Sequence, residues 1–231
     1  MSPDRFEHLL SLVGPIITKK DTRMRKAIEP AERLSLTLHY LTYGDSQQSN
    51  SFAYRIVRST VAKIIRETCD AIWVVLHKEY LKPPNSNKEW KEIADEFQRL
   101  WSFPHCAGAI DGQHLAIQCP FNSGSLYYNC KGFFSIVLLA VCDAHYSFTL
   151  VDIGNYGSNN DSGVLSHSTM GQALEAERLN LPSSEPLGGW RDHPFPYFLI
   201  DDEAFALRQW MQRPFSGRKL PEDQRIFNYR Q

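Results

Sequence analysis

The feature that most constrains this chain is a pair of apolar segments in the middle of the sequence, joined by a short connection. Residues 133–142 are almost continuously apolar, as in a strand covered on both faces, and residues 147–153 return after the connection at 143–146. This pattern predicts a central strand and its hairpin partner. The chain is therefore expected to contain a domain built around a β-sheet.

An isolated aspartate follows a shorter apolar run upstream of this pair. Residues 107–110 are small or branched and end on Asp111, and Gly112 is expected to let the chain turn before a second run at 115–118. The sequence thus predicts that Asp111 stands at the end of a strand and faces a turn.

Two further acids hold comparable positions. Asp161 precedes an expected helix that starts near Ser162, and Asp202 follows the apolar residues 197–200. Three carboxylates at one sheet edge would repel by about 4 kcal/mol per close pair at an effective dielectric of about 20, so they need a cation between them or must stand apart. The alternative is that each aspartate is a turn or cap residue.

Ligands that offer only oxygen suit Mg²⁺ or Mn²⁺ rather than zinc. Two such ions about 4 Å apart can hold the attacking and leaving oxygens of a phosphodiester. Asp111 is the first candidate ligand. The strand-end argument favours Asp202 as the second.

Four segments occur in the order GAIDGQH, YYNCKGFFSIVLLAVCD, GSNNDSGVL and DDEAFAL. Together they resemble the Harbinger transposase-derived nucleases, a DDE endonuclease group related to the PIF/Harbinger transposases, over most of the chain. The resemblance implies an α/β protein with a ribonuclease-H-like mixed-sheet core that cuts DNA with divalent Mg or Mn. It implies catalytic and metal-binding roles for Asp111, Asp161 and Asp202. It also implies DNA, and a separate DNA-binding protein, as partners.

The chain departs from that family in two places. Asp201 stands where the family's GD-x-x-(F/Y) motif has glycine, and the chain stops at IFNYRQ, where the family continues to its last catalytic glutamate. We therefore expect the 231 residues to bind divalent metal weakly and to nick supercoiled plasmid no faster than Asp111→Ala. The alternative function is a catalytically inactive descendant that recognises DNA or a partner protein.

The composition is that of an ordinary globular protein. Because the net charge is only −1, any attraction to DNA must come from local basic patches. The five cysteines form no C-x-x-C pair, which favours reduced thiols over a disulfide framework or zinc site. The N-terminus lacks the pattern of a signal peptide, and no apolar run reaches about 18 residues. We expect an intracellular protein with no membrane contact, located in the nucleus, with the cytoplasm as a further possible location.

Residues 1–100 are expected to form a helical module, and residues 101–231 the DDE-type endonuclease domain without its final segment. Ser2 and Pro3 open a first helix that Gly14 and Pro15 should stop, and a second helix runs from residue 30 to near residue 44. A long third helix follows residue 59.

A possible helix-turn-helix precedes and includes the start of that long helix. Arg55, Arg58, Lys63 and Arg66 surround it, although Val57 stands where the related proteins have glycine. A β-branched residue resists positive φ, and a plain packing module is the alternative. The basic residues 19–26, KKDTRMRK, are a second candidate for phosphate contact, against the alternative of a solvated linker.

Two loops complete the prediction. Residues 123–132 carry Tyr127, Tyr128, Asn129 and Lys131. This loop could contact a phosphate backbone through Lys131 and the tyrosine hydroxyls, or form a surface turn. Residues 182–196, which include Trp190, are predicted to form a long loop. His114 is expected to be a structural, hydrogen-bonded histidine.

Overall fold

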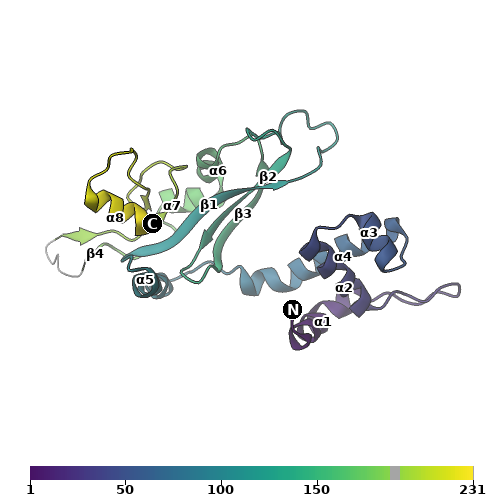
Figure 1. Cartoon of the computed structure of the whole chain (residues 1–231). Coiled ribbons are helices and arrows are strands. Elements are labelled where there is room, and N and C mark those ends of the chain that lie inside the picture. Colours follow the sequence, from purple (N-terminus) through teal and green to yellow (C-terminus); the bar gives the residue numbers. More distant parts are fainter. Residues whose placement is uncertain (188–192, 231) are drawn as a thin grey trace. The chain divides into compact units, whose positions relative to one another are not determined.

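The computed structural model describes residues 1–187 and 193–230. The chain divides into two compact units, Met1–Tyr80 and Leu81–Gln231 (Figure 1). The division lies before the boundary expected near residue 100, because the helix at 87–101 packs on a strand of the second unit.

The first unit is helical, with α1 (Pro3–Ile17), α2 (Pro30–Tyr43), α3 (Gln47–Ala53) and α4 (Arg58–Tyr80). The Ser2 hydroxyl accepts a hydrogen bond from the backbone of Arg5, which caps α1 as the sequence predicts. The helix does not stop at Pro15 but continues to Ile17, since a proline in the last turn removes only one internal hydrogen bond. Gly44 ends α2 in the left-handed conformation.

Two apolar clusters hold these helices together. One joins α2 to α4 and to the turn before α4 through Leu36, Ile56, Val61, Ile64 and Ile65, and the other joins α1, α2 and α4 through Val13, Ile17, Leu34 and Ala71. The buried Arg33 forms an ion pair with Glu67 of α4. This ion pair compensates the Arg33 charge for its removal from water.

The second unit contains α5 (Asn87–Trp101), β1 (Cys106–Ala116), β2 (Ser135–Cys142), β3 (Phe148–Tyr156), α6 (Asp161–His167), α7 (Thr169–Glu175), β4 (Glu185–Pro186), β5 (Pro194–Phe195), β6 (Phe198–Ile200), β7 (Met211–Gln212) and α8 (Glu222–Arg230). The main sheet has the order β3-β2-β1-β6-β7. Strand β2 pairs antiparallel with both β1 and β3, and β6 and β7 run parallel to β1. This mixed sheet confirms the predicted α/β, ribonuclease-H-like fold.

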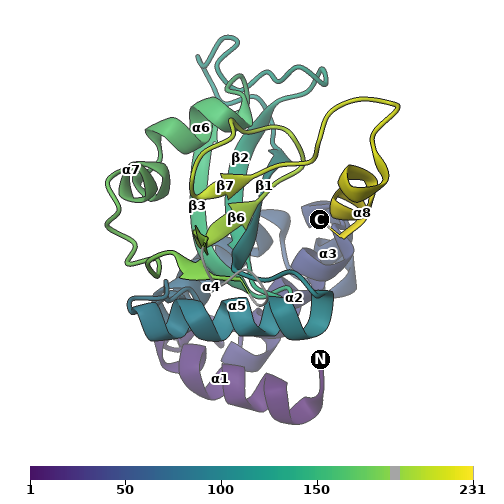
Figure 2. The same ribbon diagram turned by 90° about the vertical axis from the view of Figure 1, so that its left-hand side faces the viewer.

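Helices cover both faces of the sheet (Figure 2). Val164 and Leu165 of α6 and Met170 of α7 pack with Ile110 of β1 in the larger core cluster. On the other face, Phe97 of α5 and Phe227 of α8 pack with Phe198, Ile200 and Ala109. Ala109 and Ile110 belong to different clusters, because successive side chains of a strand point to opposite faces of the sheet.

The expected turn at Gly112 is absent, because β1 continues through this residue to Ala116. Each residue from Ala109 to Ala116 has a partner on β2, and glycine accepts the extended conformation that this pairing requires. Asp111 therefore stands within a strand rather than at its end.

The segment at 182–196 also differs from the predicted loop. Short strands β4 and β5 pair within it, while Trp190 lies outside the described residues, as does Gln231. The five cysteines are unpaired, and burial raises the pKa of Cys106 to about 12. Among the helices in the described parts of the chain, none is long and apolar enough to cross a membrane.

Candidate functional site

Asp111 lies in β1, and Asp202 lies just after β6, the strand that pairs in parallel with β1. Ala109 of β1 pairs with Ile200 of β6, and each aspartate follows its strand's member of that pair by two residues. Strand β6 ends at Ile200, so β1 has no β6 neighbour beyond this point and the Asp111 side chain is exposed. The last paired residues of β1 and β6 thus lie two positions before these two predicted carboxylates.

Asp161 approaches the same stretch of β1 from the face covered by α6. It is the first residue of α6, which Asn160 caps by accepting a hydrogen bond from the backbone of Gly163. A β-carbon placed on Gly112 would lie 2.2 Å from Asp161 Oδ1, so the absence of a side chain at Gly112 makes room for this carboxylate. Because successive side chains of a strand point to opposite faces of the sheet, the Asp111 side chain and the Gly112 position lie on opposite faces of β1.

Asp161 nevertheless responds to the charges of the other two aspartates. Burial raises the pKa of Asp161, and the negative charges of Asp111 and Asp202 raise it further. His114 and Lys131 act in the opposite direction. Asp161 Oδ1 is also buried without a hydrogen-bond partner. An orphaned carboxylate oxygen of this kind is suited to a cation.

Carboxylate oxygens suit a hard divalent cation. The unsatisfied oxygen, Asp161 Oδ1, lies against Gly112 on the α6 side of β1. Within residues 1–187 and 193–230, no three His, Cys, Asp or Glu side chains lie close enough to share one ion. A cation at Asp111 and Asp202 would therefore complete its shell of about six oxygens with water or phosphate.

Asp201 does not point its charge into this site. Its carboxylate accepts hydrogen bonds from the backbone N–H groups of Glu203, at 3.2 Å, and Phe205, at 3.0 Å. Burial raises its pKa, and these hydrogen bonds oppose the shift. The residue that replaces the expected glycine therefore shapes the loop after β6.

A buried polar network supports the region around the carboxylates. His114 Nδ1 and Asn129 Nδ2 each lie 2.9 Å from the Ser135 hydroxyl oxygen, which confirms a structural role for the histidine. Asn129 Oδ1 accepts hydrogen bonds from the backbone N–H groups of Lys131 and Phe133. The network fixes the turn that presents Lys131. Sequence reasoning missed Ser135 and the hydrogen bonds of Asn129, for which the N-C-K-G turn was the available signal.

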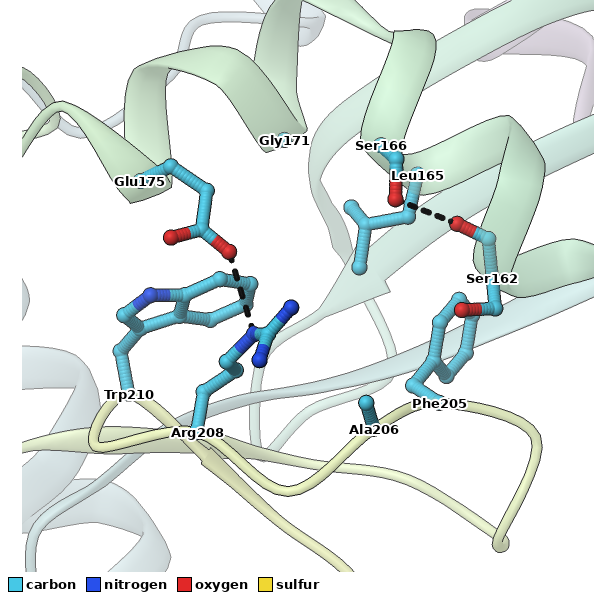
Figure 3. A pocket seen from close by; sticks show the side chains of 9 residues that line it. All are labelled: Ser162, Leu165, Ser166, Gly171, Glu175, Phe205, Ala206, Arg208 and Trp210. Atoms are coloured by element: carbon cyan, nitrogen blue, oxygen red, sulfur yellow. Dashed lines mark hydrogen bonds and ion pairs between the residues drawn. The ribbon is translucent and has the colours of Figure 1, made fainter.

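The pocket between α6–α7 and the loop before β7 is a packing junction (Figure 3). Its volume is about 30 Å³, which is space for a water molecule or two. Arg208 Nε lies 3.2 Å from Glu175 Oε1 across it, and Trp210 and Phe205 form its apolar walls. A phosphodiester cannot enter, so the open carboxylate edge is the stronger candidate site.

In the first unit, α3 and α4 are joined by a short turn, as in a helix-turn-helix. The positive φ that the turn needs falls on Arg55, at 54°, and not on Val57. Arg55, Arg58, Lys63 and Arg66 are exposed around it. Contact between this surface and DNA stays a prediction.

A mixed ribonuclease-H-like sheet with one aspartate within β1 and another just after β6 is typical of the class of DDE endonucleases. The chain belongs to this class, because the family model described as DDE superfamily endonuclease matches residues 110–231.

Particular relatives are similar along nearly the whole chain. "Putative nuclease HARBI1" of Xenopus laevis is 25% identical over 220 residues, covering 95% of this chain and 58% of its own length. Its human counterpart is 26% identical over 218 residues, with 94% and 58% covered. "Protein ALP1-like" of Arabidopsis thaliana is 26% identical over 240 residues, with 100% and 57% covered. The chain thus spans less than two thirds of these relatives, and no solved structure matches it.

Proposed function

We propose that this protein is a nuclease of the Harbinger transposase-derived type that hydrolyses phosphodiester bonds of DNA with a divalent Mg or Mn ion. The observation that supports the proposal is the parallel pairing of Ala109 with Ile200, which lie two residues before Asp111 and Asp202. The family match and the names of the relatives support it. Nuclear location is part of the proposal, because the substrate is DNA.

The chain's own residues have separable tasks in this proposal. Asp111 and Asp202 hold the ion, and Asp161 adds negative charge from the α6 side. When bound, the ion supplies Lewis acidity toward the phosphodiester. Lys131, which the Asn129 turn presents near Asp161, binds a phosphate of the substrate strand.

The second candidate is a DNA- or protein-binding module without catalytic activity. One observation favours it, namely that no three ligating side chains gather among the described residues. A site with too few protein ligands holds Mg²⁺ weakly, because this ion is reluctant to lose its water shell. A separate DNA-binding protein, as in the related transposases, fits both candidates.

Metal binding is the first test. We expect calorimetric titration of Mn²⁺ to show binding to the wild type and an affinity lower by about tenfold or more in Asp111→Asn and in Asp202→Asn. Asp143→Asn is the matched control, since Asp143 accepts hydrogen bonds from the connection after β2 and lies outside the proposed site. Equal affinities in all four proteins would refute the assignment.

Plasmid nicking separates the two candidate functions. Mn²⁺-dependent nicking that is present in the wild type and lost in Asp111→Asn supports the nuclease. Metal binding without any difference in nicking between these proteins supports the binding module.

A further inference from the structure

The segment between α1 and α2 is strongly basic and is not used by the proposed nuclease site. Residues 19–26 contain one acid, Asp21, and five cations: Lys19, Lys20, Arg23, Arg25 and Lys26. All eight residues are exposed. Figure 1 shows the segment as a long loop that extends away from the helices of its own unit.

The segment is a closed hairpin rather than a solvated linker. The Thr22 N–H donates to the Arg25 carbonyl at 3.0 Å, and the Arg25 N–H donates to the Thr22 carbonyl at 3.4 Å. The Thr22 hydroxyl also donates to the Arg25 carbonyl at 3.1 Å. Asp21 Oδ1 accepts a hydrogen bond from the Ala27 N–H at 2.8 Å. The only acid therefore helps to close the hairpin, and Arg23 and Met24 form its tip.

The base of the hairpin is fixed to the helical unit. Lys19 Nζ lies 3.2 Å from Glu67 of α4, and the same carboxylate pairs with the buried Arg33. The hairpin is thus held at its base and closed near its tip. A held hairpin loses less conformational entropy on binding than a free basic tail.

Met24 adds an exposed apolar side chain to the basic tip of the hairpin. Its side chain is 95% exposed and stands between Arg23 and Arg25, outside the apolar clusters of the unit. An apolar side chain flanked by two guanidinium groups matches a partner with rows of anions on both sides of an apolar interior. The minor groove of B-DNA has this form, with phosphates along its edges and base steps inside.

We propose that the Thr22–Arg25 hairpin enters the minor groove of duplex DNA, with Met24 against the base steps and Arg23 and Arg25 between the phosphate rows. The groove is about 6 Å wide, which admits a narrow turn but no helix. An anionic membrane is the weaker partner, because a single methionine offers little apolar area to bury in it. The inference rests on the proposed function only in taking DNA as the partner, and it requires no cleavage.

The test is fluorescence anisotropy of a labelled A·T-rich duplex with the full chain in EDTA, where metal-dependent cleavage is stopped. We expect Met24→Ala to weaken binding about tenfold. The pair Arg23→Gln and Arg25→Gln should lower the slope of log affinity against log salt by about 1.8. Netropsin, a minor-groove ligand, should displace the wild type, while a major-groove ligand should not.

Arg218→Gln with Lys219→Gln is the control, because it removes the same charge from an exposed loop of the second unit. Equal losses in both double variants, no competition by netropsin, or binding to phosphatidylserine vesicles in place of the duplex would overturn the inference. If nicking fails while hairpin-dependent binding persists, only the proposed nuclease falls. If nicking persists while the hairpin variants bind like the wild type, only the hairpin inference falls.

Discussion

The Asp161 carboxylate lies against the backbone of Gly112, so close that a β-carbon at Gly112 would stand 2.2 Å from Oδ1 and 3.1 Å from the Asp161 β-carbon. Gly112→Ala is therefore expected to displace Asp161 from β1. We expect Mn²⁺ affinity to fall about tenfold, as when a supporting residue of a metal site is removed. Calorimetric titration checks this.

Gly14→Ala serves as the control for this substitution. Its new β-carbon would meet nothing closer than 3.8 Å, and Gly14 lies in the helix α1, where alanine is favoured. If Gly112→Ala binds Mn²⁺ as well as Gly14→Ala does, Asp161 has no part in holding the ion.

The Ser135 hydroxyl joins the turn that presents Lys131 to the sheet. Ser135→Ala leaves Asn129 Nδ2 buried without its acceptor and removes the partner of His114. An unsatisfied buried donor costs about 1 to 3 kcal/mol, so we expect the free energy of unfolding to fall by about 2 kcal/mol. Urea denaturation measures it. Ser147→Ala, at an exposed position in the connection after β2, should change it little.

The fold was predictable from the sequence where one local rule decided the outcome. Continuous apolar residues marked β2, and Pro30 with Gly44 marked the ends of α2. Gly112 shows where such rules fail. Glycine suggests a turn locally, but here it serves an extended strand and leaves space for a carboxylate distant in sequence. Only tertiary packing distinguishes these uses.

The candidate site was likewise predictable from the sequence only in part. The motifs identified Asp111, Asp161 and Asp202. They did not show that Asp161 and Asp111 lie on opposite faces of β1, because the face of each residue is known only once the strand register is known. The contact between Asn129 and Ser135 was missed, since a buried hydrogen-bonded pair leaves no periodic pattern in the sequence.

Glu67 makes the helical unit sensitive to acid. Burial alone would raise its pKa, but hydrogen bonds from Lys19 and Arg33 outweigh burial and hold the pKa below its ordinary value of 4.5. A lowered pKa means that the carboxylate stabilises the fold above pH 4.5 and that this contribution is lost as pH falls through the lower folded pKa. Protonation would leave the buried Arg33 unpaired.

We therefore expect Glu67→Gln to reduce the free energy of unfolding at pH 7 by about 1 to 2 kcal/mol, less than for a fully buried pair because Glu67 is partly exposed. The difference from wild type should shrink below pH 4. Glu79→Gln, at an exposed position near the end of the same helix, is the control. A difference that does not vary with pH would refute the role of the carboxylate charge.

The turn between α3 and α4 stores backbone strain at Arg55. This residue has φ of 54°, a conformation that costs a residue with a β-carbon about 1 kcal/mol and glycine almost nothing. Arg55→Gly should therefore stabilise the unit by about 0.5 kcal/mol, after allowance for the greater freedom of glycine in the unfolded chain. Arg58→Gly is the matched control: it removes the same side chain, but at the first residue of α4, where glycine is unfavourable, so stability should fall. Urea denaturation followed by helical circular dichroism reports both changes, and a loss of stability in Arg55→Gly as large as that in Arg58→Gly would show that the arginine side chain matters more to the turn than its backbone conformation does.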